Sequence, residues 1–350
     1  MRLMTKMRSR SWIFFWAAIF SIYTFCPHKA MAESHSKIGV LIVGHGYFSE
    51  NPKFFSLADE VQSRLPDYHV ASALHMVMDM TTFLMWQTED EAIRKLEAEG
   101  VEKVIVVPLY LSTNSSTVQV IKWTIGCKVE GEPDKSDYLG EIVDCPGEYD
   151  SQNDLCKHMG AIHRRFQRFS NMCFVATDAL DYHSDVSTVL LERAQEFSTD
   201  PANEVVLLVS HGYGDDTVDQ DYRDNVLAKY ASDVKNGGSF FDVQYGTVRE
   251  DWCDKRVAAV QELRDKITTA VNDGHKVIWV PVRIASWSNI HEQEWDPPDC
   301  TKLGIKDLLD AGKYIRANYM LYKPESLADW VVSMVNEAVD NNQYTHCHEH

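Results

Sequence analysis

Two identical tripeptides, each placed directly after an apolar run, are the first residues that could do chemistry. His45-Gly46-Tyr47 follows Gly39-Val-Leu-Ile-Val-Gly44, and His211-Gly212-Tyr213 follows Val205-Val-Leu-Leu-Val-Ser210. Runs without polar alternation are typical of parallel strands that are covered on both faces. A histidine at the carboxyl end of such a strand lies where open α/β sheets bind their ligands. Because the motif occurs twice, the sequence predicts a duplicated unit with a shared chemistry.

The second half adds an acid and another imidazole to its strand-end histidine. Glu250 follows Gly246-Thr-Val-Arg249, and His291 lies beyond Pro281. Together with His211 they would form an open site for a borderline metal ion. The alternatives are a solvated charge cluster around Glu250 and a simple capping role for the histidine.

The first half is poorer in such groups. His45 is its one clear candidate ligand, and His75, inside the expected second strand, is a possible partner or a structural residue. Ser112-Thr-Asn-Ser-Ser116 follows its third strand and contains no histidine. The repeat therefore predicts one working site beside a relic or auxiliary lobe.

Alternating strand and helix patterns must position these residues. Each half has the order βαβαβ, with a Val-Pro pair in its third strand. Helices follow from apolar residues at helical spacing and from a capping box at Thr88–Glu91. We therefore predict an α/β fold of two similar doubly wound lobes with parallel sheets, related by a pseudo-twofold duplication. The expected strands are 38–43, 68–78, 104–111, 205–209, 240–248 and 276–284, and the main helices 51–65, 88–100, 186–196, 219–234 and 253–271.

The expected domain boundaries place the first lobe at 33–171 and the second at 172–340. A polar connection, 124–170, carries a predicted helix at 154–169. The amphipathic helix 326–339 is expected to pack on the second lobe. Residues 341–350 form a tail with three histidines and Cys347, which is either a metal-binding segment or a frayed end.

The first 32 residues are expected to be a cleaved signal peptide. Basic residues precede the apolar stretch Trp12–Phe25, and Ala30-Met31-Ala32 is a small-x-small cleavage site. An uncleaved anchor is the alternative, but the stretch is short for a membrane span. Cleavage would start the mature chain near Glu33 and deliver it to a periplasm, without stable membrane insertion. The remaining cysteines are then expected to form disulfides, with Cys127–Cys145 and Cys253–Cys300 as candidate pairs.

The charge of the chain excludes several partners. The full sequence carries a net charge of −18 at pH 7, and the signal segment contains no acidic residue. Such a surface argues against nucleic acid and anionic membranes as partners. It is compatible with collecting cations, although solubility alone would also explain it. No Gly-x-Ser-x-Gly elbow or P-loop points to a hydrolase or a phosphoryl-transfer enzyme.

At this point the chain resembles the class II tetrapyrrole chelatases, and in particular the sirohydrochlorin cobaltochelatase branch with two fused halves. The residues that carry the resemblance are the strand–Gly-His-Gly motif, the Val-Pro strands and the connecting stretch Ala179–Ala194. The resemblance covers most of residues 37–295, although its motifs are short.

The resemblance implies insertion of a divalent metal, Co²⁺ first and Ni²⁺ or Fe²⁺ next, into sirohydrochlorin or a related tetrapyrrole. The metal is then a substrate, and no organic cofactor is expected. His211, Glu250 and His291 would be the catalytic residues, and His211, His291 and His45 would bind the metal.

Two features of the chain depart from the family. His291 lies two residues farther past Pro281 than the family commonly places it, and Ser116 stands at the matching place in the first lobe. Export also separates the protein from the usual location of tetrapyrrole synthesis. A non-catalytic periplasmic protein that binds metal or tetrapyrrole is therefore the alternative. Trp287 and Trp295 could wall a pocket for a flat ligand or belong to the core.

Overall fold

The computed structural model describes residues 37–45, 51–75, 89–125, 127, 172–181, 183–284, 289–297, 303–317, 324–340 and 345–347. The expected signal peptide and the expected helix at 154–169 lie outside these residues. Within the described part of the chain, no helix is long and apolar enough to cross a membrane.

The first lobe is built on a five-stranded sheet in the order β2-β1-β3-β4-β9. The first four strands pair in parallel, and the short β9 joins β4 in the antiparallel direction. The strands are β1 (Ile38–Gly44), β2 (His69–Leu74), β3 (Lys103–Pro108), β4 (Cys173–Ala176) and β9 (Thr345–Cys347).

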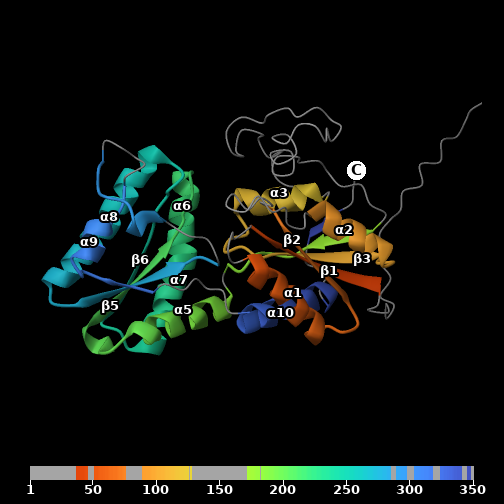
Figure 1. The fold of residues 1–350 in the computed structure, drawn as a ribbon, viewed down its shortest axis with the longest axis horizontal. Coiled ribbons are helices and arrows are strands. Elements are labelled where there is room, and N and C mark those ends of the chain that lie inside the picture. The colour runs from red at the N-terminus through yellow and green to blue at the C-terminus, as the bar shows by residue number, and fades with distance from the viewer. Residues whose placement is uncertain are drawn as a thin grey trace, which may run out of the picture. The chain divides into compact units, whose positions relative to one another are not determined.

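Helices cover both faces of this sheet (Figure 1). On one face, alternate residues of β1 such as Val40 and Ile42 share a core cluster with Phe54 and Trp330 of α1 and α10. On the other face, Leu41 and its neighbours pack with apolar residues of α2 and α3. The helices are α1 (Asn51–Arg64), α2 (Glu89–Ala98), α3 (Ser116–Thr124) and α10 (Pro324–Asp340).

The second lobe repeats this plan. Its sheet has the order β6-β5-β7-β8, which corresponds strand for strand to β2-β1-β3-β4, and every pairing is parallel. The predicted pair of doubly wound lobes is thus confirmed. The strands are β5 (Glu204–Ser210), β6 (Asp242–Thr247), β7 (Lys276–Val282) and β8 (Ile315–Arg316).

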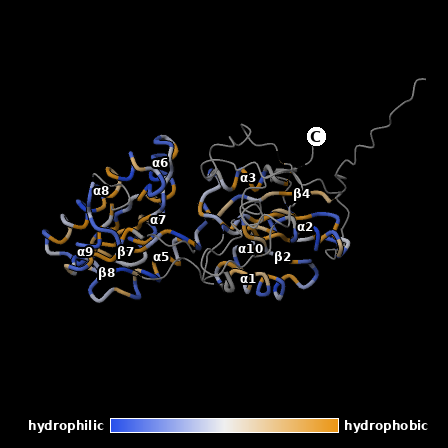
Figure 2. Tube along the Cα trace, turned by 45° about the horizontal axis from the view of Figure 1, so that its top comes forward, coloured by the Kyte–Doolittle hydropathy of each residue, from blue (hydrophilic) through white to orange (hydrophobic). Residues whose placement is uncertain are grey.

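The helices of the second lobe also form two layers. Core clusters join α5 and α7 to one face of the sheet and α8 and α9 to the other. Hydrophobic residues accordingly run along the strands and the inward helix faces (Figure 2). The predicted helix 219–234 is part of a longer run of α6, a π-helical turn and α7. The elements are α5 (Ser184–Phe197), α6 (Asp216–Tyr222), η5 (Arg223–Leu227), α7 (Ala228–Gly238), α8 (Cys253–Asn272) and α9 (Lys306–Asp310), with 3₁₀ turns η4 (Pro201–Asn203) and η6 (Asn289–His291).

The helix that follows the fourth strand is exchanged between the lobes. After β4, α5 packs on α7 and β7 of the second lobe, and after β8, α10 packs on α1 and β3 of the first. The expectation that the last helix packs on the second lobe is therefore wrong. The spacing of apolar residues in this helix reveals an apolar face, but it does not show on which sheet that face packs. The expected boundary at residue 172 falls just before β4, whereas the chain leaves the first sheet only after this strand, and part of the expected tail forms β9.

Disulfide bonds occur as the sequence predicts. Cys127, Cys173 and Cys253 are each disulfide-bonded. The candidate partners Cys145 and Cys300 lie outside the described residues, so the proposed pairings stay predictions.

Candidate functional site

A buried aspartate shapes the turn that carries His211. Gly212 has a φ of 83°, in the left-handed region that favours glycine. The Asp219 carboxylate accepts hydrogen bonds from the Tyr213 backbone N–H at 2.9 Å and from the Thr247 hydroxyl at 3.1 Å. A Cβ on Gly212 would lie only 2.5 Å from Asp219 Oδ1. The glycine of the His-Gly-Tyr motif is thus required by both the backbone angle and the close carboxylate.

Arg249 fastens the same turn from the end of β6. Its side chain donates to the carbonyl oxygens of Tyr213 at 2.6 Å and Gly214 at 2.8 Å, and its own N–H donates to the His211 carbonyl at 2.7 Å. An ion pair with Asp216 at 2.7 Å holds the other end of the guanidinium. Arg249 itself has a φ of 52°. This left-handed residue turns the chain so that the two following acids lie beside His211.

Both ring nitrogens of His211 are engaged. Nδ1 lies 2.9 Å from the Gly212 carbonyl oxygen, which only accepts, and Nε2 lies 2.9 Å from Asp251 Oδ2. Trp252 packs edge-on against the ring, with centroids 5.6 Å apart. His211 is the best exposed of the predicted catalytic residues, with 34% of its side chain accessible.

Asp251 connects the two lobes electrostatically. The hydrogen bond from His211 lowers the pKa of Asp251; burial acts in the opposite direction, and the charges of His211, Arg283 and His45 lower it further. His45 belongs to the first lobe and directly follows β1. The strand-end histidines of both lobes therefore act on one carboxylate, which the sequence analysis did not single out.

Glu250, the predicted catalytic acid, forms its shorter ion pair with Arg283 and not with His211. Its Oε1 atom lies 2.7 Å from Arg283 Nη1 and 3.8 Å from His211 Nε2. Both members of the Glu250–Arg283 pair are largely buried, with side chains 14% and 6% exposed. Arg283 directly follows β7, so it is a strand-end residue in its own right. A basic residue directly after the third strand of this lobe was the sequence feature that could have indicated this pair.

His291 lies in the core of the second lobe. Its Nδ1 atom is 2.7 Å from the Tyr314 hydroxyl, and its ring packs edge-on against Trp279 with centroids 4.8 Å apart. Burial, assisted by the charges of Arg316 and Arg283, lowers the pKa of His291 to about 3. The imidazole is therefore neutral at physiological pH.

The structure does not assemble a three-ligand metal centre from the predicted residues. Among the described residues, no three histidine, cysteine, aspartate or glutamate side chains gather in a way that could hold a metal ion. His211 and Glu250 lie together, whereas His291 is held by Tyr314 in the core. The predicted tail site includes residues that lie outside the described part of the chain.

The first lobe presents a different set of strand-end groups. His45 packs edge-on near Tyr110, with ring centroids 6.3 Å apart. His75 follows the neighbouring β2, but its side chain is only 7% exposed and its Nδ1 lies 2.9 Å from Glu89 Oε1. Ser112 forms a hydrogen bond with the buried Tyr213 hydroxyl of the second lobe. Ser116 begins α3.

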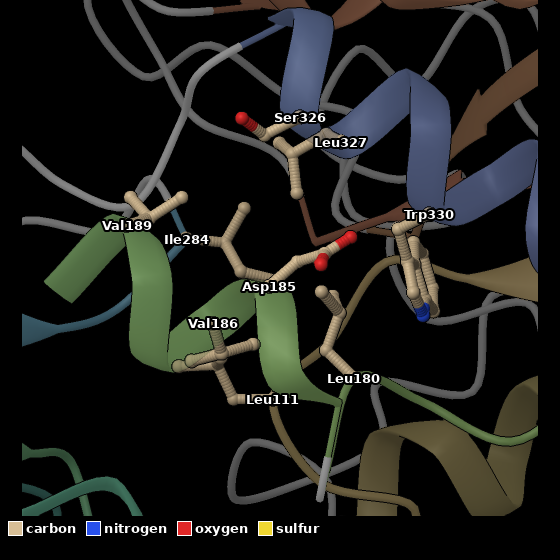
Figure 3. A pocket seen from close by; sticks show the side chains of 9 residues that line it. All are labelled: Leu111, Leu180, Asp185, Val186, Val189, Ile284, Ser326, Leu327 and Trp330. Carbon is tan, nitrogen blue, oxygen red and sulfur yellow. The ribbon is translucent and has the colours of Figure 1, made fainter. Parts of the chain in front are cut away.

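An apolar hollow between α5 and α10 is separate from these groups (Figure 3). Its lining contains no histidine, and Asp185 is its one charged residue. It therefore lacks the donors that a metal would need. The lining residues are Leu111, Leu180, Asp185, Val186, Val189, Ile284, Ser326, Leu327 and Trp330. Of the two tryptophans that could wall a pocket or belong to the core, Trp287 lies outside the described residues. Trp295 packs against the core of the second lobe and lies under Arg264 at 4.8 Å.

Comparison with known proteins gives a consistent result. The CbiX family model matches residues 39–197. The sirohydrochlorin cobaltochelatase of Methanothermobacter thermautotrophicus is 37% identical over 90 residues, which are 26% of this chain and 59% of that protein. Both matches support a relationship to the class II chelatases. The chain thus spans less than two thirds of the length of this curated relative.

Two solved structures share the fold of this chain. SirB from Bacillus subtilis with Fe³⁺ superposes with a TM-score of 0.55 at 12% identity, covering 88% of this chain and 99% of SirB. The sirohydrochlorin chelatase SirB from Bacillus subtilis subspecies spizizenii in complex with cobalt gives 0.52 at 11% identity, with 89% and 100% covered. At these identities the likeness establishes the two-lobed architecture alone.

The role of Gly212 is testable by replacement with alanine. Gly212→Ala should lower the free energy of unfolding by about 3 kcal/mol or more, because it combines left-handed strain with a clash against Asp219. Gly274→Ala is the matched control, because its φ is 91° but nothing lies within 4 Å of the added Cβ; it should cost about 1 kcal/mol. Urea unfolding measures both, and equal losses would contradict this account of the turn.

Burial of neutral His291 should make the protein acid-sensitive. Between about pH 6.5 and pH 3 the unfolded chain binds a proton on this residue that the folded chain does not. Folding stability should therefore fall as pH falls, by about 1.4 kcal/mol per pH unit from this group. Urea unfolding near pH 7 and pH 4.5 should show a loss about 2–3 kcal/mol smaller in His291→Gln than in the wild type. An identical acid loss in both proteins would exclude His291 as its source.

Proposed function

We propose that this protein inserts a divalent metal ion into sirohydrochlorin or a related tetrapyrrole, with Co²⁺ as the first candidate. The observation that carries the proposal is the exposed His211–Asp251 pair, on which His45 of the other lobe also acts. The match of residues 39–197 to the CbiX family model and the similarity to the sirohydrochlorin cobaltochelatase of Methanothermobacter thermautotrophicus support it. Imidazole nitrogen and carboxylate oxygen suit Co²⁺, Ni²⁺ and Fe²⁺.

Metal insertion has two requirements that the site must meet. A divalent ion must be delivered to the macrocycle, and two protons must leave its pyrrole nitrogens. His211 serves as a proton acceptor or a metal ligand once Nε2 has lost its proton, because a neutral imidazole performs both roles near neutral pH. Asp251 lies 2.9 Å from that nitrogen and can accept the proton or stabilise the charged ring. Glu250 is less suited to either task, because Arg283 holds its carboxylate.

The insertion reaction can be followed directly. The mature protein, sirohydrochlorin and Co²⁺, Ni²⁺ or Fe²⁺ are mixed, and the change in macrocycle absorption is recorded. His211→Ala and His45→Ala should each slow the initial rate at least about tenfold, the lower part of the range for lost acid–base or ligand groups. His69→Ala is the control, because His69 begins β2, at the opposite end of its strand, where it pairs with Glu99.

Two results would decide against an enzyme. A wild-type rate no faster than that of a His211→Ala, His291→Ala double variant would refute the proposed reaction. Binding of metal or macrocycle without turnover would support the alternative, a non-catalytic binding protein. The observation that favours this alternative is that His291 is paired with Tyr314 in the core and Glu250 with Arg283, so that two of the three predicted catalytic residues are engaged elsewhere.

We further propose that the protein works in the periplasm after removal of residues 1–32. The basic and apolar start of the sequence and the disulfide-bonded Cys127, Cys173 and Cys253 support this location. Fractionation of expressing cells and N-terminal mass spectrometry test it. The expected product is a periplasmic chain that begins near Glu33, and an intact Met1 in the cytoplasmic fraction would refute it.

A further inference from the structure

The acid that follows the second strand of the second lobe is doubled, as Glu250 and Asp251, and the structure separates the two roles. We infer that Asp251, rather than Glu250, binds the substrate metal together with His211. The inference rests on the proposed function in one respect, namely that the metal ion is the substrate. It assigns a ligand that neither the sequence motif nor the family resemblance indicated.

The geometry of the His211–Asp251 pair fits a shared metal ion. Nε2 and Oδ2 are 2.9 Å apart. Nitrogen and oxygen donors bind such ions at about 2.0–2.2 Å, so two donors at adjacent octahedral positions stand about 3 Å from each other. A metal ion can therefore take the place of the shared proton without separating the two donor atoms, once the imidazole turns its Nε2 lone pair from Oδ2 toward the ion. The Nε2–H bond breaks, a nitrogen–metal bond forms, and the proton leaves to water.

Glu250 cannot take this place without a penalty. Its Oε1 atom would have to leave Arg283, which lies 2.7 Å away and is only 6% exposed. A buried guanidinium that loses its partner is strongly destabilising. Glu250 therefore holds Arg283, and Arg283 in turn contributes positive charge near Asp251.

Accessibility points in the same direction. The Asp251 side chain is 67% exposed, whereas that of Glu250 is 14% exposed. Two protein ligands leave the remaining coordination positions to water and then to the macrocycle nitrogens. This weak, open coordination suits an ion that must be handed on, and it agrees with the lack of a three-residue centre among the described side chains.

Binding of Co²⁺ alone tests the assignment without the macrocycle. All variants are made in a chain whose tail residues His346, His348 and His350 are replaced by alanine, so that tail imidazoles do not contribute. Calorimetry gives the affinity, and visible absorption reports the ligands of the bound Co²⁺. Asp251→Asn should weaken binding at least about tenfold and change the absorption bands, with the melting temperature retained because the side chain is exposed.

Two further variants make the result specific. Asp254→Asn removes the same charge from an exposed neighbour in the first turn of α8 and should leave Co²⁺ affinity unchanged. Glu250→Gln should lower the melting temperature, because it weakens the buried pair with Arg283, and should reduce Co²⁺ affinity less than Asp251→Asn does.

The outcomes separate this inference from the proposed function. A larger loss of affinity in Glu250→Gln than in Asp251→Asn, or no Co²⁺ binding by the parent chain, would overturn the assignment of Asp251. Binding of Co²⁺ through Asp251 without insertion into sirohydrochlorin would refute the proposed reaction and leave the ligand assignment standing.

Discussion

The burial of both faces of each parallel sheet is the constraint on which the rest of the structure depends. All seven residues of β1 and all seven of β5 are buried. Strands covered in this way leave little room for solvated polar groups, and the few buried ones need partners. The polar side chains that could take part in chemistry therefore lie at the carboxyl ends of the strands, where neighbouring strands of one sheet converge. His45, His211, Arg283 and the Glu250–Asp251 pair all lie within a few residues of such an end.

The same scaffold carries different chemistry in its two copies. In the first lobe the residue after the second strand, His75, is buried against Glu89. In the second lobe the corresponding region provides an exposed acid and a buried one. Strand order has been retained while the strand-end residues have diverged, because the sheet constrains only the residues inside it. The lobe with fewer polar groups still contributes, since His45 acts on Asp251.

The spacing of apolar residues made the strands and helices of the repeated core predictable from the sequence. Which side chains pair with each other could not be predicted in this way. The strands ending at His45 and His211 and the helix that starts at Cys253 lie within a residue or two of their expected bounds. Asp251 was missed because its position depends on the left-handed backbone of Arg249, which no residue pattern announces. The site of Glu250 was anticipated, but the pairing with Arg283 joins residues far apart in the sequence. β4 and β9 are too short to show a period.

The exchange of α5 and α10 means that the two halves are not independent modules. Each half of the chain supplies the helix that closes the other half's core, and β9 adds a further strand to the first sheet. A cut in the connection between the halves would give two fragments, each with an uncovered apolar face, that remain stable only by staying associated. The covalent link between the halves is therefore not merely a linker. A shortened descendant that kept only one half would first have to replace the helix that the other half supplies.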